Sequence, residues 1–278
     1  MNAMVTVLRE QFQYFYLIRR LSVFEMKITN GNNYLGIFWE ILKPMILIAI
    51  YAFVFGVGIR GGRDIGAGVA FFPWLLAGIG VWFFFNPALM SGTKSISTKV
   101  QMISKMNFPV SVIPTYVIMS KYYAHLGLLV VIFGILQFFG FYPTIYLIQL
   151  PYYMFATFAV LFAVCLLTST LATIIRDVQV FISAVIRILL YLSPILWSPE
   201  ASDKLSEYPW ALDIMKLNPL YYLVEGYRHS LLGASKFGGW YFIHHATYTL
   251  YFWIFVFVLI GIGSVLHMKF RNRFVEYI

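Results

Sequence analysis

Two cationic side chains, Lys121 and Arg187, lie inside long apolar stretches of the sequence. A cation near the middle of a bilayer costs about 2.5–3.5 kcal/mol on insertion scales, so it should face a cavity or the interior of a helix bundle. A guanidinium group pairs well with phosphate, which makes Arg187 a candidate anion-binding residue on a pathway. The alternatives are a structural bond from Arg187 to backbone carbonyls and, for Lys121, a side chain that reaches back to the membrane surface.

Hydroxyl and lysine side chains recur in a second region, residues 91–106, between two apolar stretches. Thr93 or Ser95 could act as the N-cap of a short helix over about 93–105. A short basic amphipathic helix would suit the docking of a soluble partner, and a solvated basic loop is the alternative. The residues expected to contact such a partner are Thr93, Lys94, Ser95, Ile96, Lys99, Val100 and Ile103.

Motifs for self-contained catalysis are missing from the sequence. It has no G-x-x-x-x-G-K-[ST] phosphate loop, no H-E-x-x-H and no G-x-S-x-G, and its one cysteine, Cys165, lies in an apolar run typical of a buried thiol. Acidic residues are almost absent from the apolar stretches, although proton relays usually depend on them. We therefore expect no intrinsic catalytic site, no bound metal or cofactor, and energy supplied by another subunit.

The composition indicates an integral membrane protein. Of 278 residues, 61% are hydrophobic and 11% charged, with a mean hydropathy of +0.79, whereas soluble domains are about 25% charged. A helix needs about 20 apolar residues to cross a bilayer. The sequence predicts an all-α fold with six such spans, over about 34–59, 69–90, 112–139, 148–174, 178–198 and 246–267.

Lysine and arginine are distributed unevenly between the predicted loops. With both termini in the cytoplasm, the inner segments carry thirteen Lys and Arg against five acids, and the outer segments carry six against six. This asymmetry is the positive-inside pattern of a multi-pass protein in the plasma membrane. The net charge of +9 therefore reflects topology and does not indicate nucleic-acid binding.

The segments outside the spans also carry apolar residues. Residues 1–33 have apolar side chains every three or four positions, which predicts an amphipathic helix on the bilayer surface, or packed on the bundle or a partner. Residues 199–241 are too apolar for a free loop and should form short helices that dip back into the outer leaflet. Aromatic residues recur along the chain, and sugar rings could pack on some of them.

Short motifs occur in a fixed order along the chain: Y-L-G-I-F-W-E-I-L-K-P at 34–44, W-F-F-F at 82–85, F-P at 108–109, R-D at 176–177, S-P-I-L-W at 193–197 and N-P-L at 218–220, with Arg228. Together they resemble the permease subunits of ABC exporters of cell-surface polysaccharides. Their order and spacing cover nearly the whole chain. The resemblance is closest to permeases of the Gram-positive wall teichoic acid exporters, through K-M-N-F-P, P-T-Y, H-L-G-L-L and L-H-M-K-F-R.

The resemblance implies a homodimer that binds two copies of a separate ATPase, which holds the ATP and Mg. Residues 93–105 would be the coupling helix, and short helices after Pro199 would gate the outer exit. The substrate would be a polyprenyl-diphosphate-linked wall teichoic acid, moved from the inner to the outer leaflet. Capsule and O-antigen exporters share the same landmarks and remain the alternative.

Candidate site residues follow from both arguments. The pathway candidates are Arg187, Lys121, Trp39, Trp82, Tyr191 and Trp197, and the outer-gate candidates are Asn218, Pro219 and Arg228. Two rival functions are a membrane-embedded transferase acting on lipid-linked sugars, with an acid of 199–241 as base, and an ion-coupled flippase. The lack of a catalytic cluster argues against the first, and the lack of intramembrane acids argues against the second.

Overall fold

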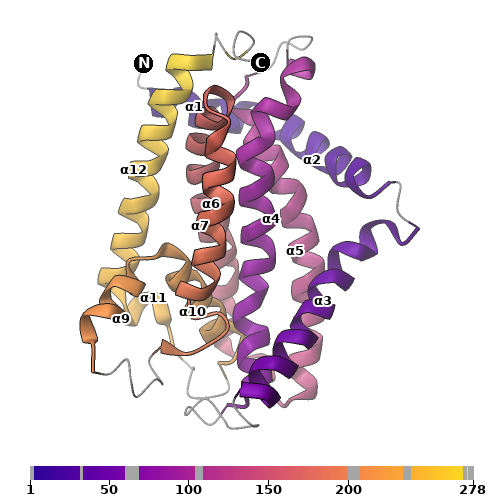
Figure 1. Ribbon diagram of the computed structural model, residues 1–278, viewed down its shortest axis with the longest axis vertical. Helices are drawn as coiled ribbons and strands as arrows, with labels where there is room; N and C mark the ends of the chain where they lie inside the picture. The colour runs from indigo at the N-terminus through magenta and orange to yellow at the C-terminus, as the bar shows by residue number, and fades with distance from the viewer. Residues whose placement is uncertain are drawn as a thin grey trace.

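The fold is helical throughout the part of the chain that the structure describes. The computed structural model describes residues 3–31, 34–59, 69–103, 109–199, 207–233, 239–271 and 274, and these ranges contain no strand. Long helices run side by side and form one bundle (Figure 1). The predicted all-α membrane fold is confirmed.

Five helical segments are long and apolar enough to cross a bilayer. They are Gly36–Gly58, Phe71–Lys99, Val112–Phe138, Ile145–Ile174 and Ala246–Phe270. The first segment consists of three elements: η1 (Gly36–Phe38), α3 (Trp39–Tyr51) and the π-helical η2 (Ala52–Ile59). The second and third segments are α4 (Phe71–Ile103) and α5 (Val112–Phe138). The fourth is η3 (Ile145–Gln149) followed by α6 (Leu150–Ile174), and the fifth is α12 (Ala246–Phe270). Five of the six predicted spans are therefore found near their expected positions.

The remaining predicted span, 178–198, corresponds to a shorter helix. α7 (Asp177–Leu192) has 16 residues, about 24 Å at 1.5 Å per residue, which is less than the roughly 30 Å hydrocarbon core. It packs against α4 and α6 and connects the two ends of the bundle (Figure 1). The chain leaves the helix at Ser193, whose backbone is extended, and continues towards Trp197. The sixth crossing remains a prediction.

The two ends of the bundle differ. α1 (Ala3–Gln13) and the last turn of α12 lie at one end, called here the α1 end (Figure 1). The opposite end carries α9 (Pro209–Lys216), α10 (Pro219–Leu231) and α11 (Tyr241–His244), and is called the α10 end. The prediction of short helices in 199–241 is confirmed for these elements, while residues 200–206 and 234–238 lie outside the described residues.

Burial separates a central group of helices from a peripheral one. Of the apolar window in Phe71–Lys99, 72% is buried, against 11% in Gly36–Gly58. α4 packs on α5 and α6, and α6 packs on α12, so these helices form the core. α3 contacts the bundle mainly through α4 and α5, and η2, which continues it, leaves large side chains such as Phe53 and Val57 exposed.

The N-terminal segment forms two helices instead of one. α1 ends at Gln13 and α2 (Phe15–Asn30) begins after a turn at Tyr14. Polar side chains attach both helices to α5, whereas most of the predicted apolar face is exposed, as at Phe12 and Phe24. Both expectations for this segment therefore have support: it packs on the bundle and it presents an apolar surface suited to lipid.

The predicted short helix at 93–105 is wrong as a separate element. α4 continues without a break to Ile103, and Thr93 and Ser95 lie inside it. No glycine or proline interrupts residues 93–107, and the hydroxyls bond within the bundle: Ser95 Oγ donates to the Gly92 carbonyl at 2.6 Å. α4 has 33 residues, about 50 Å in length, so its last turns extend beyond a bilayer core of about 30 Å.

Candidate functional site

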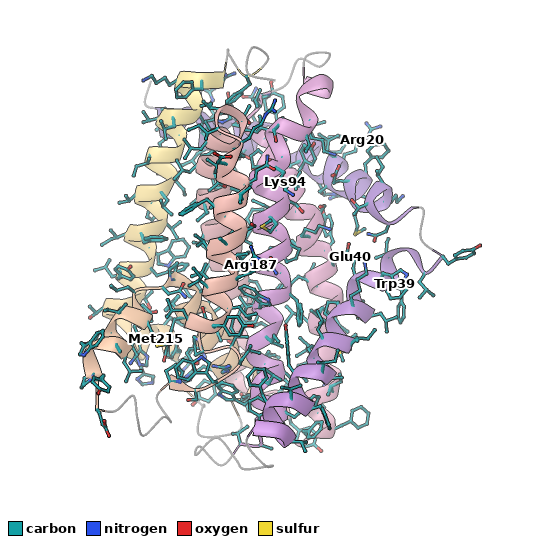
Figure 2. All side chains as sticks on the ribbon, viewed as in Figure 1. Arg20, Trp39, Glu40, Lys94, Arg187 and Met215 are labelled. Atoms are coloured by element: carbon teal, nitrogen blue, oxygen red, sulfur yellow. The ribbon has the colours of Figure 1, made fainter. Side chains whose placement is uncertain are left out.

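A pocket between α3, α4 and α5 contains two of the predicted pathway residues, Trp39 and Lys121. Its volume is about 210 Å³. Its lining consists of Trp39, Glu40, Lys43, Pro44 and Leu47 from α3, Phe83 and Pro87 from α4, and Lys121, Ala124, His125 and Leu128 from α5. We call it the α3–α5 pocket. Figure 2 places Trp39 and Glu40 near the start of α3, next to α2.

The charged groups of the α3–α5 pocket are arranged around one ion pair. Lys121 Nζ lies 3.3 Å from Glu40 Oε1, and both side chains are largely buried. Asn30 Nδ2, from the last turn of α2, donates to the same carboxylate oxygen at 3.3 Å. Lys43 Nζ lies 5.7 Å from the centroid of the Trp39 ring. Within the described residues no carboxylate is within ion-pair distance of Lys43, so the pocket has a net positive charge.

His125 forms the inner wall of the pocket and is only 2% exposed. Its ring stacks on Phe84, with 4.9 Å between the centroids. Its Nε2 lies 3.0 Å from the hydroxyl oxygen of Tyr227 on α10. This contact joins α5 to α10, and Nδ1 is buried with no partner among the described residues. The imidazole therefore closes the inner side of the pocket while its Nδ1 stays buried.

The other pathway candidates are not in this pocket. Trp82 is buried in the main core at 4% exposure and has no access to a pathway through the isolated chain. Arg187 and Tyr191 lie on α7 with exposed side chains (Arg187 in Figure 2). Arg187 Nε donates to the Ser183 carbonyl at 3.1 Å, which is the structural bond weighed above as the alternative. Trp197 Nε1 donates to the Tyr191 carbonyl at 2.8 Å, so these two aromatics are neighbours.

The predicted partner-docking residues divide into buried and exposed groups. Ile96 and Thr93 are buried, and Thr93 Oγ1 lies 2.9 Å from Thr168 Oγ1 of α6. Lys94 is exposed and lies towards the α1 end (Figure 2). The backbone of Val100 and Ile103 belongs to α4, but their side chains lie outside the described residues, as do residues 104 and 105. Ile96 therefore serves internal packing, which is a correction to its predicted contact with a partner.

Ile96 belongs to a small hydrophobic cluster at the α1 end that is separate from the main core. The other buried members are Ile18, Val110, Val112, Ile113, Tyr116, Val117 and Phe274. They come from α2, from the C-terminal part of α4, from the start of α5 and from the segment after α12. The last turns of α4 are thus held in a packed unit with α2 and α5.

Polar contacts join the same elements. Lys99 Nζ lies 2.8 Å from Glu25 Oε2, which links α4 to α2. Glu10 of α1 accepts a hydrogen bond from Ser111, and its other oxygen lies 3.0 Å from Arg271 Nη1. The acidic residues Glu10 and Glu25 were not singled out from the sequence. The available signal was different for the two: Glu10 lies opposite the apolar residues of its helix, whereas Glu25 interrupts the apolar face, between Ile18 and Leu21 around the helix axis.

Arg228, an outer-gate candidate, is fully buried at the α10 end. Its guanidinium carbon lies 3.4 Å from the centroid of the Trp74 ring on α4. Nε donates to the Trp74 carbonyl at 3.3 Å, and Nη1 lies 2.5 Å from Glu225. Nη2 also donates to the Ile195 carbonyl at 3.4 Å. Arg228 therefore fixes α10 to α4 and to the segment after α7.

Asn218 and Pro219 form the start of α10. Asn218 is the N-cap residue, and its Oδ1 accepts a hydrogen bond from the Leu220 amide at 3.0 Å. Its Nδ2 donates to Ser193 Oγ at 2.8 Å. Pro219 occupies the first turn, where its missing N–H costs nothing. The N-P-L motif thus starts a short helix and joins it to the end of α7.

The structure places a charged set at the α3–α5 pocket that the sequence indicated only in part. Lys121 and Trp39 were predicted, whereas Glu40, Lys43 and His125 were not selected as site residues. Their signal was the presence of ionisable side chains within apolar spans. In the part of the chain that the structure describes, no group of three or more His, Cys, Asp or Glu side chains is placed to bind a metal ion.

Comparison with known proteins finds relatives that carry the same protein name. Two relatives come from Klebsiella pneumoniae, and both are called O-antigen export system permease protein RfbA. Each is 26% identical to this chain. The first match covers 91% of both chains, and the second covers 89% of this chain. A protein of the same name from Myxococcus xanthus is 24% identical over 81% of this chain and 84% of its own length. Residues 16–232 match the family described as ABC-2 type transporter. Since this match covers well over half of the 278 residues, the chain belongs to the ABC-2 type transporter family.

Proposed function

We propose that this protein is the permease subunit of an ATP-driven exporter that moves a lipid-linked polysaccharide of the O-antigen type across the plasma membrane. The observation that carries the proposal is the likeness to proteins named O-antigen export permeases over about nine tenths of both chains. A likeness of this extent includes the spans, the end of α4 and the short helices of the α10 end.

The energy source in this proposal is a separate ATPase. Two copies of that subunit hold ATP and Mg and dock at the α1 end, where the last turns of α4 extend past the bilayer. The exposed Lys94 offers a contact there, and the cluster around Ile96 gives the docking segment a rigid base. The termini at this end are cytoplasmic, in agreement with the excess of Lys and Arg.

A second copy of the chain completes the exporter in this proposal. η2 and α7 expose large apolar and aromatic side chains such as Phe53, Phe181 and Tyr191. In the homodimer the path runs between the two bundles, and Arg187 contributes a cation to it. The polymer moves from the inner to the outer leaflet attached to a polyprenyl diphosphate.

Wall teichoic acid is the second candidate substrate. It is favoured by the K-M-N-F-P, P-T-Y and H-L-G-L-L motifs of the sequence. The names of the relatives favour O-antigen polysaccharide instead. The two candidates differ in chemistry, since a teichoic acid has a polyol-phosphate backbone and an O-antigen is built mainly of sugars.

The first test is purification of the tagged chain in a mild detergent, with mass spectrometry of what stays bound. We expect a stoichiometric partner with a Walker A motif. A chain that purifies alone, even after crosslinking in the membrane, would contradict the ABC assignment of the energy source. Sugar-transfer activity of the purified chain without ATP would favour the transferase, and transport driven by an ion gradient would favour the flippase.

The second test identifies the polymer. Depletion of the permease should cause lipid-linked polymer to accumulate inside the cell, where it can be extracted and its phosphorus-to-sugar ratio measured. A low ratio supports an O-antigen polysaccharide, and a ratio near one phosphate per repeat supports teichoic acid. Export of both polymers at normal rates after depletion would contradict both candidates.

A further inference from the structure

The α3–α5 pocket combines features that point to an anionic ligand. Two lysines, Lys43 and Lys121, meet there with a single carboxylate, Glu40. The buried ring of His125 forms the inner wall, so the charged groups gather at the outer part of the pocket. A volume of about 210 Å³ accommodates one or two phosphate groups and excludes a sugar chain.

The position of α2 sets the depth of this pocket. Ser22 Oγ of α2 donates to the Tyr123 hydroxyl of α5 at 3.4 Å, two residues from Lys121. Asn30, at the end of α2, reaches Glu40. The outward side of α2 exposes Phe15, Phe24 and Ile28, the kind of face that enters a bilayer at the headgroup boundary. The pocket therefore lies at the depth of lipid phosphates.

We propose that the α3–α5 pocket binds the phosphate headgroup of a lipid, with Lys43 and Lys121 as its cationic ligands. The proposal rests on the proposed function for the identity of the lipid, which is the polyprenyl diphosphate that carries the polymer. Arg187, on α7, lies outside this pocket and has a different role. His125, held in place by the Phe84 stack and the Tyr227 hydroxyl, forms the rigid inner wall behind the two lysines.

The ion pair between Lys121 and Glu40 joins α5 to α3 across the pocket. A diphosphate that enters places its own oxygens against Lys121 and competes with the Glu40 carboxylate, which keeps its hydrogen bond from Asn30. Lys43, at the mouth, meets the ligand first because it is exposed and beside the Trp39 ring. Glu40 thus lowers the affinity for any anion, and a ligand with two negative charges competes with it for Lys121 better than a ligand with one.

The experiment measures lipid binding to the full-length chain by native mass spectrometry in mild detergent without ATP. The probes are farnesyl diphosphate, dioleoyl phosphatidylglycerol and inorganic pyrophosphate. The variants are K43A and K121A, with K27A as the matched control, since Lys27 is an exposed lysine of α2 outside the pocket. Each pocket variant should bind farnesyl diphosphate about tenfold more weakly, the loss of one charge-assisted hydrogen bond, while K27A binds normally.

The outcomes separate the sources of the phosphate. Loss confined to farnesyl diphosphate supports the polymer carrier as the ligand, and an equal loss for phosphatidylglycerol supports an ordinary membrane phospholipid in the same site. If pyrophosphate binds with the same dependence on both lysines, the site recognises phosphate without the lipid tail. Equal binding by K43A, K121A and K27A for all three probes overturns the proposal.

Glu40→Gln distinguishes a direct role of Lys121 from a structural one. If Lys121 contacts phosphate, E40Q should bind farnesyl diphosphate as tightly as the unmodified chain or more tightly, because a competing carboxylate is gone. Binding as weak as in K121A would show that Lys121 acts only through its ion pair, which overturns its assignment as a ligand. K43R, which keeps the charge, should retain binding.

Failure of this inference is distinguishable from failure of the proposed function. Normal ATP-dependent export by K43A and K121A with unchanged lipid binding would remove the pocket and leave the exporter assignment intact. Lysine-dependent lipid binding in a protein that recruits no ATPase would support phosphate binding at the pocket and contradict the assignment of the protein to an exporter.

Discussion

Glu25 of α2 and Lys99 of α4 form an ion pair in which the lysine Nζ lies 2.8 and 2.9 Å from the two carboxylate oxygens. The pair joins the amphipathic α2 to the last turns of α4, which extend beyond the bilayer. Asn30, in the last turn of α2, donates to Glu40 at the start of α3. Polar contacts thus connect three elements that are separate in sequence: the end of α4, α2 and the start of α3.

Charge reversal of this pair tests the connection. E25K and K99E should each speed amide hydrogen exchange in α2 by about two- to fivefold, because a partly exposed ion pair contributes about 0.2–1 kcal/mol. The double variant E25K/K99E re-forms the pair in the opposite sense and should restore protection. Hydrogen-exchange mass spectrometry makes the measurement. If the double variant exchanges faster than either single variant, the two residues are not coupled.

Arg228 should be among the most sensitive positions for stability. R228A leaves Glu225 without this partner and removes the stack on Trp74, and breaking a buried ion pair from one side costs about 3–5 kcal/mol. R228K should recover only part of the loss, since an ammonium group lacks the planar face that lies over the indole. Thermal unfolding followed by tryptophan fluorescence tests this. R187A, which changes an exposed arginine, is the control and should leave the midpoint unchanged.

Gly78 provides the space that Arg228 occupies. A Cβ at this position would lie 2.6 Å from Arg228 Nη2 and 2.8 Å from Nε, so the guanidinium would have to move off Trp74. We expect G78A to reduce stability by about 1–3 kcal/mol, the usual cost of overpacking a core. G134A is the matched control, because no atom lies within 4 Å of the Cβ that it adds. Equal unfolding midpoints for the two variants would contradict this account.

Ile96 and Lys94 should separate packing from docking. I96A should lower stability by about 2–5 kcal/mol through the cavity it leaves, and I96V by about 0.5–1.5 kcal/mol. K94A changes an exposed side chain, so it should keep the unfolding midpoint and weaken retention of the ATPase in a pull-down. Undiminished retention by K94A would argue against a docking role for this residue. A stable I96A would show that the cluster at the α1 end adds little.

Arg187 should matter for export and not for folding. Among the described residues its side chain is exposed and donates one hydrogen bond, to the carbonyl of Ser183 in its own helix, so R187A should assemble normally. We expect R187A to reduce the amount of polymer at the cell surface and R187K to retain part of it, because a cation remains. Quantifying surface polymer at equal permease levels makes the comparison. An unchanged amount of surface polymer in R187A would mean that Arg187 has only a structural role, through its hydrogen bond to the Ser183 carbonyl.

The sequence alone determined the class of fold and most of the spans. Long apolar segments without charges cannot remain in water, and a backbone in lipid must bond within its own helix, so five helices were found close to their predicted limits. The short helices at the α10 end followed from apolar residues interrupted by Asn218 and the prolines around it. These properties depend on local composition, which a sequence displays directly.

Tertiary structure decided which polar residues meet. Lys121 and Glu40 are 81 positions apart and Glu25 and Lys99 are 74 apart, so no local pattern pairs them. Ile96 was expected on a partner-facing surface because its helix was expected to begin near Thr93. Instead α4 continues and turns Ile96 into the cluster formed with α2 and α5. The side of a helix that becomes buried depends on its neighbours in space, and those neighbours are fixed only when the whole bundle packs.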